Sequence, residues 1–523
     1  MSTLPVSPAP AAASVGRVNF FRSTVFQIIV VGLISFVGPG LWNGGALALE
    51  GTLPVALFLT FLALQPNPSE PAVLSSRTCI VFSLMGLGCI FAPVIINAVG
   101  VKNTLLAGTL GWSVYTAALY QNNRYGTEWF VILGAVICGI SAGLYWAAEG
   151  AIVLSYPEPH KRGRYLAVWL FFKNSGTILA GAINLGTNIH RSTGGKVNYK
   201  TLLAFIALQV LALPFAFLIS KPERVQRDDR TPVPLPPKTT VKEQLKALWK
   251  ACSTQKVGVL LPVFFASWYY WGYSSSFLTL YFSVRARALA SFLSAICGVF
   301  ATTLLGFFLD SQRLSIAARA RIGAAATFTL FSGILIWAIV VQHQFTEHNP
   351  GKLDWTDTTG QFGKGFGLYV MLNAAGNCVQ NYLVRAPFVQ LPRAGFRARM
   401  LTGFTALLQY WLISVLAEDL GVSARYAGLL RGVESFGQCA AFGVNSSRFN
   451  LTYTVVIIIV FWAVSLPSSF ITILKVGIAE GYGGSSAAVA GDVEKRGSET
   501  GDDSSDLEDE KRESEEDAKP AAV

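Results

Sequence analysis

Two charged residues stand inside long apolar runs of this 523-residue sequence, Glu149 and Lys173. A charge in hydrocarbon costs free energy, so it marks either a pathway for a solute or ion or a structural contact. Tyr145 lies one helical turn before Glu149, and Asn184 lies on the same helical stripe as Lys173. Three interpretations therefore stand for Glu149 and Lys173: a buried ion pair, a substrate or proton site, and side chains that reach for the membrane surface.

A second group of polar residues lies in apolar runs near the end of the sequence. Arg431 and Glu434 are three residues apart, so they can pair on one helix face. Asn373, Asn377 and Gln380 form a polar stripe on another predicted helix. Polar residues in lipid contact neighbouring helices or a water-filled cavity. The stripe is predicted to bind a substrate or to join helices, and the charged pair to be local or to face a cavity.

Aromatic residues cluster in one predicted span, at Trp268, Tyr269, Tyr270, Trp271 and Tyr273. Such a cluster is typical of the aromatic belt at a membrane surface. It could equally form a stacking surface for an organic solute. Tyr269 and Tyr273 are candidate solute contacts under the second interpretation.

The composition decides the broad class. Apolar residues make up 52% of the chain and charged residues only 14%, whereas soluble proteins carry about 25% charged residues. Too few charges remain to cover a surface that faces water, so we expect an all-α, polytopic integral membrane protein. A secreted disulfide scaffold, a cytosolic enzyme and a nucleic-acid binder are excluded on this ground. The seven cysteines lack metal-site spacing, and no nucleotide or catalytic motif occurs, so we expect no enzyme activity, cofactor or metal.

Apolar runs of about 20 residues predict spanning helices. Two groups of six runs flank a basic, proline-rich linker at 220–256, which is predicted to be extended and to lie in the cytoplasm. The sequence therefore predicts twelve transmembrane helices in two six-helix halves, residues 25–219 and 257–475. The runs are 25–47, 78–98, 104–121, 129–154, 166–187, 201–219, 257–282, 289–309, 321–341, 365–383 continued by 410–417, 424–446 and 452–475.

The two ends of the sequence differ from the apolar body. Residues 1–24 lack the charged start and apolar run of a secretory signal and are predicted to be disordered. Residues 476–523 form an acidic, low-complexity tail with the same prediction. Lys and Arg are more numerous in the loops on the side of both termini, which predicts cytoplasmic termini. Plasma and vacuolar membranes both stay open.

Several short motifs resemble known families. Gly306, Asp310 and Arg313 follow the eighth run and resemble the cytoplasmic loop motif of the major facilitator superfamily. Further stretches together resemble the fungal branch of the Unc-ninety-three-like membrane proteins. These stretches are Pro39-Gly-Leu-Trp42-Asn43, Gly139-Ile-Ser-Ala-Gly143, Ser155-Tyr-Pro-Glu-Pro159, Gly163-Arg-Tyr165, Gly181-Ala-Ile-Asn184 and Ala424-Arg-Tyr-Ala-Gly428. The resemblance implies a major-facilitator fold, and it makes Asn43 a further cavity candidate.

Two segments interrupt the pattern of spans. Residues 384–409 split a span and contain two prolines and four arginines. Their ends can be encoded by splice-site sequences, so they are either a retained intron of 26 codons or a true extramembrane insertion. Residues 54–64 are apolar but too short to span. They are re-entrant, interfacial or, with their neighbours in 51–66, an error of the gene prediction.

Two functions remain open from the sequence. The first is a secondary transporter that moves a small solute by alternating access, with protons taken up at Glu149. The second, which the resemblance to the Unc-ninety-three-like proteins implies, is a non-transporting regulatory or trafficking subunit of another membrane protein, an ion channel or a receptor. In both cases the lipid bilayer is a partner and nucleic acid is not.

Overall fold

The computed structural model describes residues 19–44, 70–158, 161–233, 239–253, 258–309, 314, 316–382, 420–446 and 450–475. Within these ranges every regular element is a helix, apart from two isolated bridges. Eight stretches there are long and apolar enough to cross a bilayer. The predicted class, an all-helical membrane protein, is confirmed. The eight stretches are Thr24–Gly44, Thr78–Val99, Trp129–Ser155, Arg164–Asn188, Tyr199–Phe217, Val284–Leu305, Arg321–Glu347 and Leu451–Ile471.

The N-terminal group of helices follows the predicted apolar runs. A π-helical turn, η2 (Phe36–Gly40), interrupts the first span at Pro39. Such a turn rearranges the helical hydrogen bonds where proline lacks a donor. The group consists of η1 (Phe20–Arg22), α1 (Thr24–Ser35), η2, α3 (Glu70–Val99), α4 (Val101–Gly108), α5 (Leu110–Tyr125), α6 (Trp129–Ser155), α7 (Arg162–Asn188), α8 (Tyr199–Gln209) and α9 (Ala212–Phe217).

The C-terminal group begins after a linker that contains η5 (Pro222–Arg224) and α10 (Val241–Ser253). Its helices are α12 (Leu261–Ser267), α13 (Tyr270–Tyr281), α14 (Val284–Leu309), α15 (Ile316–Glu347), α16 (Gln361–Tyr382), α19 (Leu420–Ser446) and α20 (Leu451–Lys475). Gly306 lies in α14, whereas Asp310 and Arg313 lie outside the described residues. So do the two doubtful segments, 51–66 and 384–409.

Three further predicted spans are divided into shorter helices. Residues 104–121 form parts of α4 and α5, 201–219 form α8 and α9, and 257–282 include α12 and α13. The break between α8 and α9 has a physical cause, because Pro214 cannot donate a hydrogen bond to the carbonyl of Val210. Hydropathy predicts that a segment is buried in lipid but not where its helix breaks.

The prediction of disorder up to residue 24 was wrong for residues 19–24. Asn19 accepts a hydrogen bond from the backbone of Phe21 and begins η1, and Ser23 caps α1 in the same way. The backbone N–H of Asn19 also donates to Gln226 Oε1 at 2.8 Å. These polar caps fix the chain before the first span because the free N–H groups of a helix start need acceptors.

The linker was expected to be extended, but it contains the helix α10. Thr240 and Glu243 form a reciprocal capping box: Thr240 N donates to Glu243 Oε2 at 2.8 Å, and Glu243 N donates to Thr240 Oγ1 at 3.3 Å. The hydrogen bonds from Thr240 lower the pKa of Glu243. The sequence signal for this box is Thr-x-x-Glu, and it could have predicted the helix.

Thr240→Ala is expected to destabilise α10 while leaving the membrane helices unchanged. Loss of a helix N-cap costs about 1 kcal/mol, which corresponds to about fivefold faster opening of the helix. Hydrogen–deuterium exchange of the 241–253 amides measures this change. Unchanged exchange would show that contacts with α3 and α19 alone hold α10 in place.

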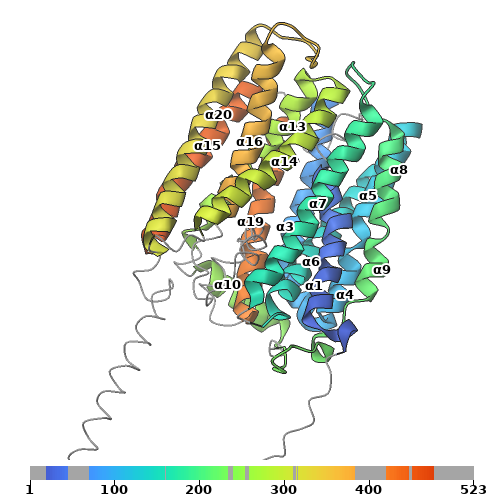
Figure 1. The fold of residues 1–523 in the computed structure, drawn as a ribbon, viewed down its shortest axis with the longest axis vertical. Helices are drawn as coiled ribbons and strands as arrows, with labels where there is room; N and C mark the ends of the chain where they lie inside the picture. The colour runs from blue at the N-terminus through green and yellow to red at the C-terminus, as the bar shows by residue number, and fades with distance from the viewer. Residues whose placement is uncertain are drawn as a thin grey trace, which may run out of the picture.

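The most extensive contacts between the N-terminal and C-terminal groups are those of α3 with α19 and of α7 with α14. Figure 1 shows these four helices between α1, α4, α5, α8 and α9 on one side and α15, α16 and α20 on the other. Glycine allows the first pair to approach closely, because a Cβ at Gly428 would lie 2.6 Å from the carbonyl oxygen of Cys89. The two groups therefore meet along a central seam.

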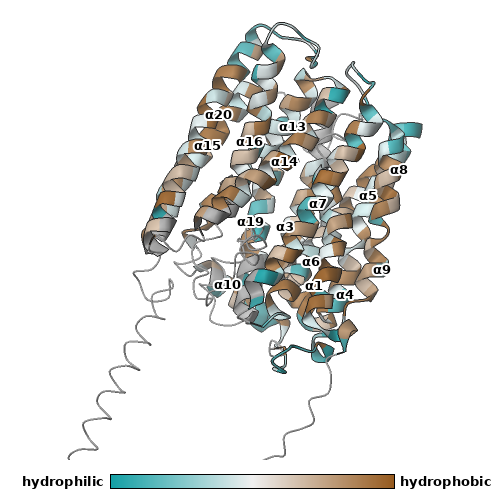
Figure 2. Cartoon of the chain, in the orientation of Figure 1, coloured by the Kyte–Doolittle hydropathy of each residue, from teal (hydrophilic) through white to brown (hydrophobic). Residues whose placement is uncertain are grey.

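The outward helix faces are strongly apolar. Figure 2 shows many brown, hydrophobic residues along the helices and teal, hydrophilic residues gathered at the two ends. Phe300 is 70% exposed and Ile336 64% exposed. Apolar side chains in such positions fit contact with lipid rather than water. We call the end that carries α10 the linker end and the opposite end, with the loops at 189–198 and 348–360, the loop end.

Candidate functional site

A cavity of about 170 Å³ lies on the seam between the two helix groups. Lys173 and Arg431 are the charged side chains among the lining residues that the structure describes. The neutral polar lining consists of Asn43, Asn174, Thr177, Ser291, Ser294, Thr302, Asn373, Asn377 and Gln438. Five indoles also line the cavity, those of Trp42, Trp112, Trp146, Trp268 and Trp271.

Glu149 lies beside the cavity but does not line it. Its side chain is fully buried. Its Oε1 atom accepts hydrogen bonds from the Tyr145 hydroxyl at 2.6 Å, from Trp169 Nε1 at 2.6 Å and from the Ser35 hydroxyl. Its Oε2 atom has no hydrogen-bond partner in the structure. A buried carboxyl therefore has one saturated oxygen and one oxygen that can carry a proton.

The direct ion pair between Glu149 and Lys173, one of the three interpretations of the sequence, is not formed. No carboxylate oxygen of the described residues lies within 4.0 Å of the Lys173 ammonium. The ammonium instead lies over aromatic rings, 4.8 Å from the centroid of Trp146 and 5.7 Å from that of Trp169. Trp169 thus bonds Glu149 through its N–H and faces Lys173 with its ring. An aromatic face stabilises a cation without a counter-charge.

Trp146 joins the two cations of the cavity. The Arg431 guanidinium lies 4.4 Å from the centroid of its ring, and Lys173 lies 4.8 Å from the same centroid. The two cationic groups are therefore less than about 10 Å apart, where like charges repel by about 2 kcal/mol at an effective dielectric constant of about 20. Arg431 Nη1 also donates to Glu434 Oε1 at 2.5 Å, so the predicted pair within one helix is present. Glu434 is buried behind Arg431 and does not line the cavity.

The polar stripe of α16 faces the cavity in part. Asn373 Nδ2 donates to the Ser274 hydroxyl at 2.9 Å, and Asn377 Nδ2 donates to the Asn373 carbonyl at 2.8 Å. Both side chains line the cavity. Gln380 belongs to α16, but its side chain lies outside the described residues. The stripe therefore combines a helix–helix contact at Asn373 with polar groups that a solute can reach.

Three other predicted candidates lie away from the cavity. Asn184 Nδ2 donates to the Ser291 hydroxyl at 3.3 Å and so joins α7 to α14. Tyr269 packs on Phe461 with ring centroids 5.0 Å apart. Tyr273 is fully buried in the C-terminal group. The aromatic-belt interpretation was wrong for Tyr269 and Tyr273, because both side chains point into the bundle.

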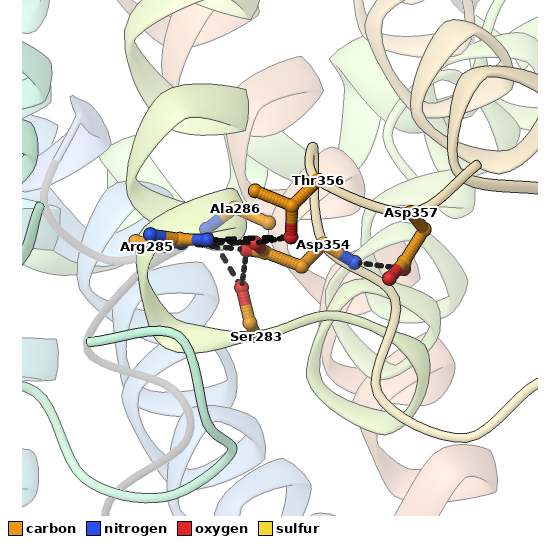
Figure 3. Close-up of polar contacts among 6 residues, drawn as sticks. All are labelled: Ser283, Arg285, Ala286, Asp354, Thr356 and Asp357. Carbon is orange, nitrogen blue, oxygen red and sulfur yellow. Dashed lines mark hydrogen bonds and ion pairs between the residues drawn. The ribbon is translucent and has the colours of Figure 1, made fainter. Parts of the chain in front are cut away.

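A cluster of polar residues closes the C-terminal group at the loop end (Figure 3). The Asp354 carboxylate accepts hydrogen bonds from the Ser283 and Thr356 hydroxyls at 2.6 and 2.9 Å, and it pairs with the Arg285 guanidinium. The Asp354 backbone N–H donates to Asp357 Oδ2 at 2.5 Å. Burial alone would raise the pKa of Asp354, but the hydrogen bonds from Arg285, Ser283 and Thr356 lower it to about 2. The carboxylate is therefore ionised at any physiological pH.

The same segment binds the N-terminal group. The backbone N–H groups of Val284 and Arg285 donate to the carbonyls of Thr193 and Arg191 at 3.0 and 2.9 Å. The Arg287 guanidinium donates to the Gly195 carbonyl at 2.5 Å. We call the contacts of 191–195, 283–287 and 352–357 the loop latch. The loop latch holds the two helix groups together at the end of the seam that lies opposite α10.

Comparisons with known proteins identify the family of this chain. The family model described as "Ion channel regulatory protein UNC-93" matches residues 76–305. Notoamide biosynthesis cluster protein O' of Aspergillus versicolor is 32% identical over 465 residues, which are 88% of this chain and 91% of that protein. An UNC93-like protein of Schizosaccharomyces pombe is 27% identical over 464 residues, 87% of this chain and 83% of that protein. The chain belongs to the UNC-93 family.

The fold of this UNC-93 family chain is also similar to a solved transporter structure. FucP, a major facilitator superfamily transporter in the outward conformation, aligns with a TM-score of 0.51. The alignment has 12% sequence identity and covers 86% of this chain and 98% of FucP. This similarity shows the fold alone. The resemblance to the UNC-93 family seen in the sequence is thereby confirmed, and the fold agrees with the major-facilitator fold that this resemblance implies.

The UNC-93 family chain brings together part of the predicted site. Asn43, Lys173, Asn377 and Arg431 line one cavity, with Glu149 one indole away from it. Sequence reasoning missed the central indole, Trp146, and the loop latch. Trp146 follows Tyr145 directly in the sequence. Nothing in the residue spacing, however, indicates that cations from two distant helices lie near its indole ring. The arrangement can bind a small solute and hold a proton. Its cationic groups line the cavity, whereas its carboxylates are buried and do not line it.

Proposed function

We propose that this UNC-93 family chain is a proton-coupled secondary transporter of a small solute that works by alternating access. The observation that carries the proposal is the polar and charged cavity on the seam between the two helix groups. Transporters of this architecture bind their substrates between the repeats and near the membrane midplane. No chemical step or cofactor is part of this proposal.

The proton site in the proposal is Glu149. Its fully buried carboxyl has one oxygen with three donors and a second with none. When Glu149 is charged, it attracts the Lys173 ammonium electrostatically, because both groups contact Trp169 and therefore lie near each other. When Glu149 carries a proton, that attraction is lost and the Lys173 ammonium gains freedom to bind a solute. Proton and solute binding would in this way favour each other.

The topology in the proposal has twelve spanning helices in two halves with both termini in the cytoplasm. The four further spans in this proposal are α4–α5, α12–α13, α16 and α19, which are less apolar than the eight candidate spans. In α16 and α19 the polar residues that lower hydropathy, such as Asn377 and Arg431, line the cavity. Their polarity thus fits helices that face a solute pathway. The positive charges of the linker end support its place in the cytoplasm.

The first test of this function is a thermal-shift screen of the purified chain. Sugars, amino acids, nucleobases, organic acids and metal ions are added at pH 5 and pH 7. A ligand of the folded state raises the melting temperature by mass action. Each hit is then tested for uptake into proteoliposomes with an inward proton gradient. The transporter proposal is wrong if hits bind but none is ever moved across the bilayer.

A cysteine pair offers a test of alternating access. The Sγ atoms of Cys79 in α3 and Cys439 in α19 lie 2.8 Å apart. Oxidation by copper phenanthroline and O₂ would join them in a disulfide, with two protons released and two electrons passed to the oxidant. We expect the oxidised protein to lose most of its uptake, because α3 and α19 belong to different helix groups, and to regain it after reduction.

The control for this oxidation is Cys79→Ser, which leaves the other six cysteines in place. Uptake by this variant should not change with the oxidant. Mass spectrometry of the joined peptides verifies the cross-link. Full uptake by the cross-linked protein would show that α3 and α19 do not move against each other.

A second candidate function has its own support. The matching family model is described as an ion channel regulatory protein. In this alternative the chain keeps the fold but binds another membrane protein, a channel or a receptor, and transports nothing. Affinity purification from a mild detergent distinguishes the two. A membrane protein that co-purifies in fixed ratio, together with an absence of ligands in the screen, would favour the regulatory function.

A further inference from the structure

The wall of the cavity carries charge of one sign. Lys173 and Arg431 line it, and across the described part of the chain no acidic side chain does so. Glu434 is buried and pairs with Arg431, Glu149 is buried and accepts a hydrogen bond from Trp169, and neither carboxylate lines the cavity. Both cations contact one indole, Trp146, so they are held close together without a shared carboxylate. An anion placed between them would relieve their mutual repulsion.

The remaining wall is aromatic. Trp42, Trp112, Trp268 and Trp271 line the same space as Trp146. Indole faces bind flat, apolar ring systems by stacking and edge contacts. Asn43, Asn174 and Asn377 add groups that can orient polar substituents. The volume of about 170 Å³ restricts the ligand to a small molecule.

We propose that the cavity binds small aromatic organic anions, with the carboxylate between Lys173 and Arg431 and the ring against the indoles. This inference rests on the proposed transport function only where it implies that the bound anion is a transport substrate. The binding itself can be measured without transport. It excludes organic cations, which would meet two positive charges. It also gives non-aromatic acids a weaker contact, because they offer no ring to the tryptophans.

The test is isothermal titration of the purified full chain at pH 7 with three matched probes. Indole-3-acetate is an aromatic anion, tryptamine an aromatic cation and cyclohexaneacetate a non-aromatic anion. We expect indole-3-acetate to bind about tenfold or more tightly than either of the others, since each lacks one of the two recognised features. Equal or tighter binding of tryptamine, or no binding of indole-3-acetate, would overturn the inference.

Variants locate the site. Lys173→Gln should weaken indole-3-acetate binding about tenfold or more, and Lys173→Arg should retain most of it, since it keeps the charge. Lys200→Gln, which removes one positive charge from the exposed start of α8, should have no effect. Unweakened binding by folded Lys173→Gln overturns the inference. If that variant does not fold, the comparison of the three probes on the unmodified chain decides.

Uptake into proteoliposomes separates this inference from the proposed function. Binding of indole-3-acetate without any uptake supports the anion site and contradicts transport. Uptake of a cationic or neutral solute, together with an absence of indole-3-acetate binding, supports transport and contradicts the anion site. Uptake of indole-3-acetate that Lys173→Gln abolishes supports both.

Discussion

Glu149→Gln is expected to abolish concentrative uptake while solute exchange at equal pH continues. Glutamine keeps an oxygen that can accept from Tyr145, Trp169 and Ser35, so the local packing is retained. It cannot take up a proton, so an inward proton gradient no longer drives the solute. We expect accumulation to fall about tenfold or more, to the level reached without a gradient. Uptake of the first hit of the thermal-shift screen, with and without a pH gradient, measures this.

The matched control is Glu347→Gln, which removes a carboxylate from the exposed end of α15. Its uptake should follow the unmodified chain at every gradient. If Glu149→Gln still concentrates the solute, Glu149 is a structural carboxyl that holds α1, α6 and α7 together. Tyr145→Phe then becomes informative, because it removes one of the three donors without a change of charge.

Hydropathy predicted most of the helical segments because their apolar length is a local property. Thus α6 (Trp129–Ser155) and α20 (Leu451–Lys475) begin and end close to the runs at 129–154 and 452–475. Helix breaks depend on finer chemistry, such as proline at 214 or the capping box of Thr240. The capping signal was present in the sequence, but the basic, proline-rich composition around it favoured an extended linker.

The site was less predictable because its contacts join distant segments. The sequence indicates that Glu149 and Lys173 lie on adjacent helices and could pair. In the structure, Trp169 contacts both of them: its N–H donates to Glu149, and its ring faces the Lys173 ammonium. Arg431 reaches Trp146 only because α19 packs against α6 and α3. Spacing within one helix predicted the pair of Arg431 and Glu434 correctly, since that pair is local. Nothing local couples Arg285 to Asp354.

Asp354→Ala is expected to open the loop end of the seam. The substitution removes the carboxylate that binds Arg285, Ser283 and Thr356. The guanidinium of Arg285, which is 18% exposed, is left against Trp355 without its ion pair. Loss of one partner from a largely buried charge pair destabilises the conformation that contains it. The segment 283–287 also bonds the 191–195 loop, so its release weakens the contact between the two helix groups.

Labelling of a cavity cysteine measures this opening. Ser294→Cys places a thiol on the cavity wall, in a chain whose native cysteines are replaced. We expect an impermeant maleimide applied from the loop end to react about tenfold or more faster in the Asp354→Ala variant, because an open state that is rare becomes populated. Glu223→Gln, a change at the linker end, should leave the rate unaltered.

The loop latch should not respond to pH between 5 and 7, which makes its role separable from that of Glu149. The pKa of Asp354 is lowered to about 2 from its ordinary value of 3.8. A lowered pKa means that the ionised latch contributes stability above pH 4 and loses it only as pH falls toward 2. Labelling of Ser294→Cys, divided at each pH by the labelling rate of a fully exposed reference cysteine, should therefore be equal at pH 5 and pH 7 if the latch alone controls the loop end. A normalised rate that is faster at pH 5 than at pH 7, but equally fast at both pH values in Glu149→Gln, would show that protonation of Glu149 opens the loop end. The path would be α7, the helix that carries Lys173 and Trp169 and leads into the 191–195 loop.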